Sequence, residues 1–312
     1  MEVSNHDDHL RIRVDAEQRR TFHQIIESAR MQSIYAGADD VASMRKAAVT
    51  FGRFPLARSA PVPLEWRDID LSGLPGLECR WPGDSEPARV LYFHGGGFVC
   101  GSLPAARGMI GSLCAALRRT VVAIGYRQAP EHVHPAALED AHAGFAWISS
   151  RAAQPVLLIG ESAGGLLALE AARRAAQRRE QTPEAVVACS PWFDVSMSGR
   201  SWVENAARDI ISIQMGRLFQ SHYLSGQDPR AIWEALITSD FSRMPPVLIQ
   251  VGELEMPLDD SRALASRVMR AGGRVTLEVY DGMPHGFVKF AGPVGDFALG
   301  RISSWFEELD TD

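Results

Sequence analysis

The sequence predicts an α/β fold in which helices cover both faces of a mostly parallel sheet. From about Arg89 onward, short apolar runs rich in β-branched residues alternate with longer segments that have helical spacing. Such alternation is typical of βαβ units, and strands that are apolar along their whole length suit a sheet that is buried on both faces. The 312 residues are compatible with one large domain, and no repeat or low-complexity linker divides them.

Six strands are predicted in this alternating part, and helices fit between or after them. The strands are 90–93, 120–125, 155–159, 185–189, 246–251 and 275–280, and the helices are 107–118, 135–149, 163–179, 259–271 and 294–308. Upstream, segments 64–70 and 76–81 flank a Ser-Gly-Leu-Pro turn, which predicts an antiparallel pair at one edge of the sheet. The expected sheet therefore has eight strands.

Two stretches do not follow the alternation. Residues 1–50 carry apolar side chains at helical spacing, and residues 197–240 form a long insertion between two strands. Connections of that length are usually functional. We interpret 1–50 as an N-terminal cap segment and 197–240 as a cap insertion, both lying over a core formed by 51–196 and 241–312. Peripheral helices without any role toward substrate are the alternative.

Composition excludes several classes of function. The formal net charge is −6 and there is no basic run, which argues against binding of nucleic acid. No apolar stretch approaches the ~18 residues of a membrane span, and the polar N-terminus lacks the apolar centre of a signal peptide. The four cysteines have no CxxC spacing, so we expect buried free thiols, no metal site and a cytoplasmic location. The sequence leaves a homodimer open.

Ser162 is the predicted nucleophile. It stands in Gly160-Glu161-Ser162-Ala163-Gly164, between a short apolar run and a helix. A G-x-S-x-G nucleophile elbow requires this strand–turn–helix context, because the two glycines let strand and helix approach each other at a tight, strained turn. The start of the helix also places the Ala163 N–H near a developing oxyanion.

Three consecutive glycines, Gly95, Gly96 and Gly97, follow another apolar strand, between His94 and Phe98. Without side chains in the way, their N–H groups can face a substrate carbonyl, as in an HGGG-type oxyanion loop. Together with the Ala163 amide they are the predicted oxyanion hole. We assign His94 to the architecture of this loop.

His285 is the predicted general base. In α/β hydrolases the serine, the acid and the histidine follow one another in this chain order. Of the nine histidines, only His222 and His285 come after Ser162. His222 lies in the 197–240 insertion, whereas His285 lies in a loop directly after the last predicted strand.

The acid that orients His285 is expected in the loop after strand 246–251. Four carboxylates lie there: Glu253, Glu255, Asp259 and Asp260. Both aspartates fall at the start of a predicted helix, which is a sufficient structural reason for them. Asp281 is a further rival, but its position suits a turn that closes the strand. We therefore favour Glu255, since a glutamate can hold the histidine tautomer and stabilise the imidazolium.

Between about Arg89 and Lys289 the chain resembles the bacterial hormone-sensitive-lipase-like esterases, a branch of the α/β hydrolases that includes acetyl esterases and acetyl hydrolases. The matching segments are 94–98, 126–132, 135–140, 160–165, 190–192 and 281–286. Two positions depart from the usual pattern of the family. Glu161 stands where an aspartate commonly precedes the serine, and the acid motif begins with Glu255 instead of aspartate.

The resemblance implies an α/β-hydrolase fold with a helical cap, and hydrolysis of small or short-chain acyl esters through an acyl-enzyme. It implies a small-molecule ester as partner and no metal or organic cofactor. Apolar side chains expected to shape the pocket are Phe98, Trp202, Ile210, Met215 and Phe219, with plain core packing as the alternative. Lactone opening, amide or N-acetyl cleavage and acyl transfer would use the same triad. A non-catalytic receptor for small ligands is the alternative from a different class.

Overall fold

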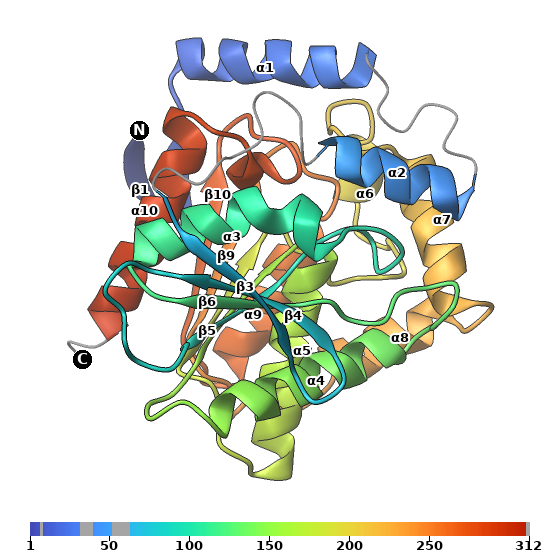
Figure 1. Ribbon diagram of the computed structural model, residues 1–312. Coiled ribbons are helices and arrows are strands. Elements are labelled where there is room, and N and C mark those ends of the chain that lie inside the picture. Colours follow the sequence, from blue (N-terminus) through green and yellow to red (C-terminus); the bar gives the residue numbers. More distant parts are fainter. Residues whose placement is uncertain (7–8, 32–39, 52–62, 310–312) are drawn as a thin grey trace.

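In the computed structural model of this chain, the described residues form a central ten-stranded sheet (Figure 1). The structure describes residues 1–6, 9–31, 40–51 and 63–309. The strand order is β1-β2-β10-β9-β8-β7-β5-β6-β4-β3. In chain order the strands are β1 (Glu2–His6), β2 (His9–Arg13), β3 (Glu65–Asp70), β4 (Pro75–Arg80), β5 (Val90–Phe93), β6 (Val121–Ile124), β7 (Leu157–Glu161), β8 (Ala185–Cys189), β9 (Val247–Gly252) and β10 (Val275–Tyr280).

The parallel part of the sheet confirms the prediction from the sequence. The strands β5 to β10 pair with one another in parallel. At one edge β3 pairs with β4, and β4 with β6, in antiparallel orientation, as expected for the two upstream segments. Because parallel strands end at the same edge of the sheet, the loops after β5, β7, β8, β9 and β10 come together there.

The prediction of eight strands was wrong, as was the helical pattern assigned to the first residues of the 1–50 segment, of which residues 7–8 and 32–39 lie outside the described part of the chain. β1 and β2 form an antiparallel hairpin, and β2 adds to the sheet in parallel beside β10. The reason is a short period-two pattern in which Leu10 and Ile12 alternate with arginines. Ile12 is fully buried, while Arg11 points the other way and donates from Nε to Asp281 Oδ1 at 2.6 Å.

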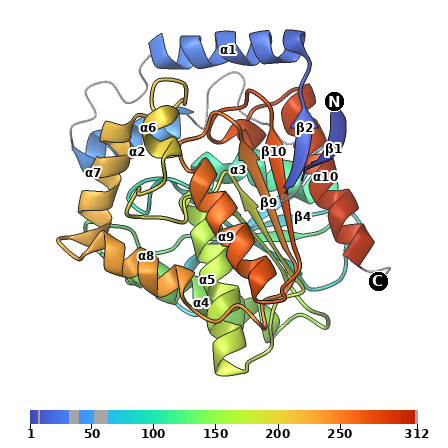
Figure 2. The ribbon, with the colours of Figure 1, turned by 180° about the vertical axis from the view of Figure 1, so that it is seen from behind.

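Helices cover both faces of the sheet. On one face lie α4 (Ala136–Ser149), α5 (Ala163–Arg178) and α9 (Leu258–Arg270), and on the other lie α3 (Leu103–Leu117) and α10 (Pro293–Leu309). α3 is in front in Figure 1, and α9 is in front in Figure 2, which shows the molecule from behind. A hydrophobic core lies on each face of the sheet, and β5 contributes to both. Leu91 and Phe93 pack on the side of α4, α5 and α9, and Val90 and Tyr92 pack on the side of α3 and α10.

The remaining helices are α1 (Ala16–Met31), α2 (Val41–Phe51), α6 (Ser201–Glu204), α7 (Ile213–Leu224), α8 (Pro229–Ile237) and the 3-10 turn η1 (Phe287–Lys289). In both ribbon views α1, α2, α6 and α7 lie toward the same end of the molecule. Arg45 of α2 donates to Val99 O at 3.0 Å and to Glu131, so α2 is fastened to the segment after the glycine loop. The division into cap and core stays a prediction. Within the described ranges, no helix is both long and apolar enough to cross a bilayer.

Candidate active site

The turn between β7 and α5 holds Ser162 in a strained conformation. Ser162 has φ 54° and ψ −120°, and residues other than glycine rarely adopt a positive φ. A Cβ atom on Gly160 would lie 1.9 Å from the Gly164 carbonyl oxygen, and one on Gly164 would lie 2.1 Å from the Phe93 carbonyl oxygen. The two glycines are therefore required by close backbone contacts, as the G-x-S-x-G pattern predicts, and the serine is presented at the carboxyl edge of the sheet.

A continuous line of hydrogen bonds joins three of the predicted site residues. His285 Nε2 lies 2.9 Å from Ser162 Oγ, and His285 Nδ1 lies 3.0 Å from Glu255 Oε2. Because a carboxylate can only accept, Nδ1 carries the proton donated to Glu255, and Nε2 is left to accept from the serine hydroxyl. Glu255 is fully buried, and Ser162 and His285 are each 8% exposed. This is the arrangement in which a histidine can remove the proton of a serine.

The other carboxylates considered for the acid have different partners. Asp259 Oδ2 accepts from the Ser201 amide at 3.0 Å, and Asp260 Oδ1 accepts from Trp202 Nε1 at 3.0 Å. Glu253 accepts from the Gly282 amide at 2.9 Å. Asp281 binds Arg11. Of the weighed carboxylates, Glu255 is the one that the fold brings to His285.

The loop after β8 holds the carboxylate of Glu255 in place. Glu255 Oε1 accepts from Ser190 Oγ at 2.7 Å and from the Gly252 amide at 2.6 Å, which leaves Oε2 for the histidine. Ser190 Oγ in turn accepts from the Gly286 amide at 3.0 Å. One hydroxyl thus connects the acid to the loop that carries the base.

Electrostatics in this group favour a histidine that is readily protonated. Burial raises the pKa of Glu255, against the hydrogen bond and charge of His285. For His285, burial lowers the pKa, but the hydrogen bond and charge of Glu255, with the charges of Asp209 and Glu161, outweigh burial. The pKa of His285 therefore lies above its ordinary value, and the site stabilises the imidazolium that forms when the serine proton is taken.

The glycine loop after β5 reaches the same place. Gly96 and Gly97 have positive φ values of 123° and 61°, and both line a cavity with Ser162 and His285. Gly95 packs against Glu161, since a Cβ atom there would be 2.5 Å from Glu161 Oε2. The His94 ring shapes the loop as expected, with Nδ1 2.8 Å from the Gly95 carbonyl oxygen. The loop backbone is thereby aimed at the serine together with the start of α5, where Ala163 lies.

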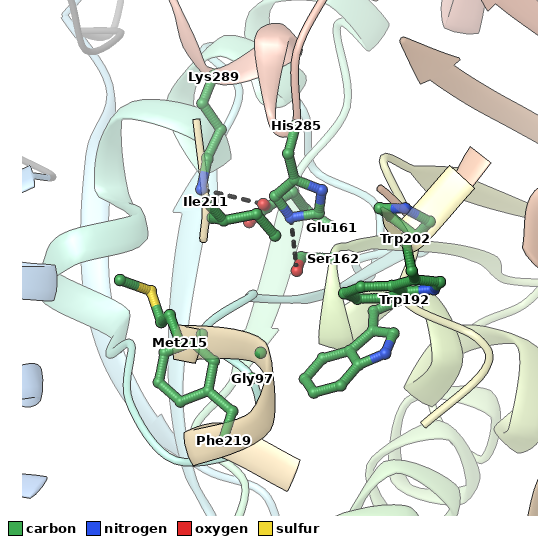
Figure 3. A pocket seen from close by; sticks show the side chains of 13 residues that line it. Gly97, Glu161, Ser162, Trp192, Trp202, Ile211, Met215, Phe219, His285 and Lys289 are labelled. Carbon is green, nitrogen blue, oxygen red and sulfur yellow. Dashed lines mark hydrogen bonds and ion pairs between the residues drawn. The ribbon is translucent and has the colours of Figure 1, made fainter. Parts of the chain in front are cut away.

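The cavity at Ser162 encloses about 80 Å³ (Figure 3). Its wall is apolar on the side of the insertion and carries an ion pair on another side, where Lys289 Nζ lies 2.9 Å from Glu161 Oε1. The lining residues are Gly96, Gly97, Glu161, Ser162, Trp192, Trp202, Ile211, Met215, Gly216, Phe219, Pro257, His285 and Lys289.

Three of the five predicted pocket residues line this cavity, namely Trp202, Met215 and Phe219. Phe98 and Ile210 are corrections. Phe98 is fully buried behind the glycine loop, with its ring stacked on Tyr223 at 4.0 Å. Ile210 packs against the core that contains α3 and α10, and its neighbour Ile211 lines the cavity instead. Helical spacing could not show which of the two isoleucines faces the cavity, because the residues before α7 form an irregular turn.

Sequence reasoning also missed side chains that the fold brings to the site. Lys289 lies four residues after His285, and the turn η1 brings its side chain to the cavity. This short spacing from the predicted base could have indicated Lys289 as a site residue. Trp192 lies in the loop after β8. It is close to Ser162 because β7 and β8 are parallel neighbours and end at the same edge of the sheet. Asp209 accepts from the His285 amide, and no local pattern marks it. Across the described segments, no group of three or more His, Cys, Asp or Glu side chains is placed to hold a metal ion.

Comparison with known proteins shows the family. A family model described as alpha/beta hydrolase fold matches residues 90–289. An acetyl-hydrolase of Streptomyces hygroscopicus is 36% identical over 208 residues, which cover 65% of this chain and 69% of that protein. The esterase LipI of Mycobacterium tuberculosis is 32% identical over 257 residues, covering 75% of this chain and 79% of that protein.

Solved structures agree with these relatives. An esterase from the bacterial hormone-sensitive lipase family has a TM-score of 0.83 and 30% identity, covering 95% of this chain and 99% of that one. The resemblance first drawn from the motifs is thereby confirmed. This chain belongs to the hormone-sensitive-lipase-like esterases of the α/β-hydrolase fold.

Proposed function

We propose that this serine carboxylic-ester hydrolase acts on small or short-chain acyl esters, with Ser162 as nucleophile, His285 as general base and Glu255 as orienting acid. The observation that carries the proposal is the line of hydrogen bonds from Glu255 through His285 to Ser162, at 3.0 and 2.9 Å. Curated relatives are named esterase and acetyl-hydrolase, which supports an ester as the small-molecule substrate.

In the proposed reaction, Ser162 Oγ attacks the ester carbonyl while His285 Nε2 takes its proton. The amides of Gly95, Gly96, Gly97 and Ala163 stabilise the negative charge on the carbonyl oxygen. The protonated His285 then gives its proton to the leaving alcohol, and an acyl-enzyme remains. A water molecule, deprotonated by the same histidine, releases the carboxylic acid and restores the serine.

The size of the cavity supports short acyl groups. Its volume of about 80 Å³ is about half that of an engineered 150 Å³ apolar cavity that takes up benzene. Trp202, Met215 and Phe219 close it on the side of the insertion. We therefore propose that acetyl to butyryl esters are preferred to longer ones.

We propose the cytoplasm as the place of action. All four cysteines are free and buried, as is usual for proteins of reducing compartments. A homodimer stays a prediction.

The test is turnover of p-nitrophenyl acetate, butyrate and octanoate beside a lactone and an anilide, with Ser162→Ala as control. We expect the short esters to be cleaved fastest, and the variant to lose about 10⁴-fold or more in kcat while keeping its thermal stability. Faster turnover of the lactone or the anilide would favour the alternative hydrolases. Tight binding of small molecules without turnover would favour a receptor.

A further inference from the structure

Asp209, in the turn after α6, is a buried carboxylate whose partners lie in two distant loops. Its side chain is fully buried. Oδ1 accepts from the amide of Ile210 at 2.7 Å and from the amide of His285 at 2.8 Å. Oδ2 accepts from the amide of Met256 at 2.8 Å. One side chain of the insertion therefore binds the backbone of the general base and the residue that follows the acid.

We propose that Asp209 is a positioning residue, which fixes the loops of Glu255 and His285 relative to each other and so couples the insertion to the catalytic triad. The inference rests on the proposed function of that triad. It assigns to the insertion a second task beside lining the cavity, namely keeping the base in register with the serine.

The three amides named above require the charged form of Asp209. Each is an N–H donor, and a protonated carboxyl would place an O–H where an acceptor is needed. Burial raises the pKa of Asp209, against the charge of His285 and the hydrogen bonds from the three amides. Amide donors of this kind are the usual compensation for a buried carboxylate.

The negative charge of Asp209 also acts on the imidazole. Among the described residues, Glu255, Asp209 and Glu161 place negative charge near His285, and all three raise its pKa, while Lys289 is paired with Glu161. Removing the charge of Asp209 should therefore lower the pKa of His285. Activity, which needs the neutral base, would then persist to lower pH.

A neighbouring residue strengthens the same connection. Asn205 Nδ2 donates to the carbonyl oxygens of Glu253 at 3.1 Å and of Glu255 at 2.9 Å, and Asp209 N donates to Asn205 O at 3.0 Å. The turn that begins at Asn205 thus binds both kinds of backbone group in the loop of Glu255: Asn205 donates to its carbonyl oxygens, and Asp209 accepts from one of its amides. Ser190, in the loop after β8, binds the loops of Glu255 and His285 through its hydroxyl. Asp209 connects the same two loops from the insertion.

The test compares Asp209→Asn with Asp194→Asn. Asp194 is an equally buried aspartate of the same connection, but its carboxylate accepts from Ser196 and Ser198 of its own turn. An asparagine at 209 keeps the shape, yet its NH₂ group cannot accept from a backbone amide on that side. We expect kcat for p-nitrophenyl acetate to fall about 10- to 100-fold with little change in KM. The acid limb of the kcat/KM profile should move to lower pH.

In Asp194→Asn, kcat should stay within about threefold of wild type and the acid limb should not move, although thermal stability falls. A folded Asp209→Asn variant with normal kcat and an unchanged limb would overturn the inference, as would an equal shift in Asp194→Asn. If Asp209→Asn does not fold, Asp209→Glu carries the test. This variant keeps the negative charge, but its longer side chain displaces the two loops. We therefore expect kcat to fall while the acid limb of the kcat/KM profile stays at the same pH. A normal kcat would refute the positioning role.

Labelling of Ser162 by a fluorophosphonate separates this inference from the proposed function. If wild type neither cleaves esters nor is labelled, the proposed triad fails. If wild type is labelled and active but Asp209→Asn reacts at the same rate with the same pH dependence, only the role of Asp209 fails.

Discussion

One wall of the cavity consists of loops at the carboxyl ends of β5, β7, β8, β9 and β10, whereas the other consists of α6, α7 and the turn between them. In the first wall, geometry is imposed by the backbone, as in the positive φ of Ser162 and the contact between Gly160 and Gly164. In the second, it depends on side chains that meet across the fold, as in the bond from Trp202 Nε1 to Asp260 at 3.0 Å. We therefore propose that the strand-end wall carries the chemistry and that the insertion wall selects the substrate.

Substitution of the acid should show the largest effect after loss of Ser162. In Glu255→Gln, His285 loses the acceptor that holds its tautomer, so we expect kcat to fall by about 10³- to 10⁴-fold with little change in KM. Asp259→Asn is the matched control, because that residue binds the insertion at Ser201. Steady-state kinetics on p-nitrophenyl acetate decide the matter. A larger loss in Asp259→Asn than in Glu255→Gln would show that the acid is misassigned.

The contrast between the walls also explains what could be predicted from the sequence. Ser162, Gly96 and Gly97 sit in local patterns, because a tight turn at a strand end restricts residue types within a few positions. His285 was found differently, by its place in the chain order after Ser162. These residues come together because parallel strands end at one edge, which the alternation of apolar runs already implies.

Other features depend on contacts that no short window contains. The hairpin β1–β2 was missed because its five-residue strands are mostly polar, and burial of Ile12 requires the edge of β10. The exchange of Ile211 for Ile210 is set by an irregular turn, where neither helical nor strand periodicity applies. The role proposed for Asp209 depends on hydrogen-bond partners that are 47 and 76 residues away in the chain.

A charge pair on the strand-end wall provides a second prediction. Glu161 is buried against Gly95 of the glycine loop, and Lys289 Nζ lies 2.9 Å from its Oε1. In Lys289→Met, the carboxylate would remain uncompensated near the oxygen that becomes negative in the transition state. We expect kcat to fall about 10- to 100-fold.

The double variant Glu161→Gln/Lys289→Met is the control for this prediction. With both charges removed, kcat should return to within about fivefold of wild type, which is the non-additivity expected of two directly interacting residues. Circular dichroism and thermal melting would verify that all variants fold. Additive losses in the double variant would mean that Lys289 acts through packing and not through the charge of Glu161.

The smallest effect is expected in the insertion wall, where the structure separates two adjacent isoleucines. Ile211 lines the cavity, whereas Ile210 packs against the core beside α3 and α10. Ile211→Ala should widen the cavity and raise the ratio of kcat/KM for p-nitrophenyl octanoate over acetate by about 3- to 10-fold, since a few methylene groups in an apolar pocket discriminate to about this extent. Ile210→Ala should lower stability without changing that ratio. If Ile210→Ala changes the preference instead, the turn after Asp209 presents the other side chain to the substrate. The insertion wall would then be rebuilt on binding, while the strand-end wall keeps its geometry.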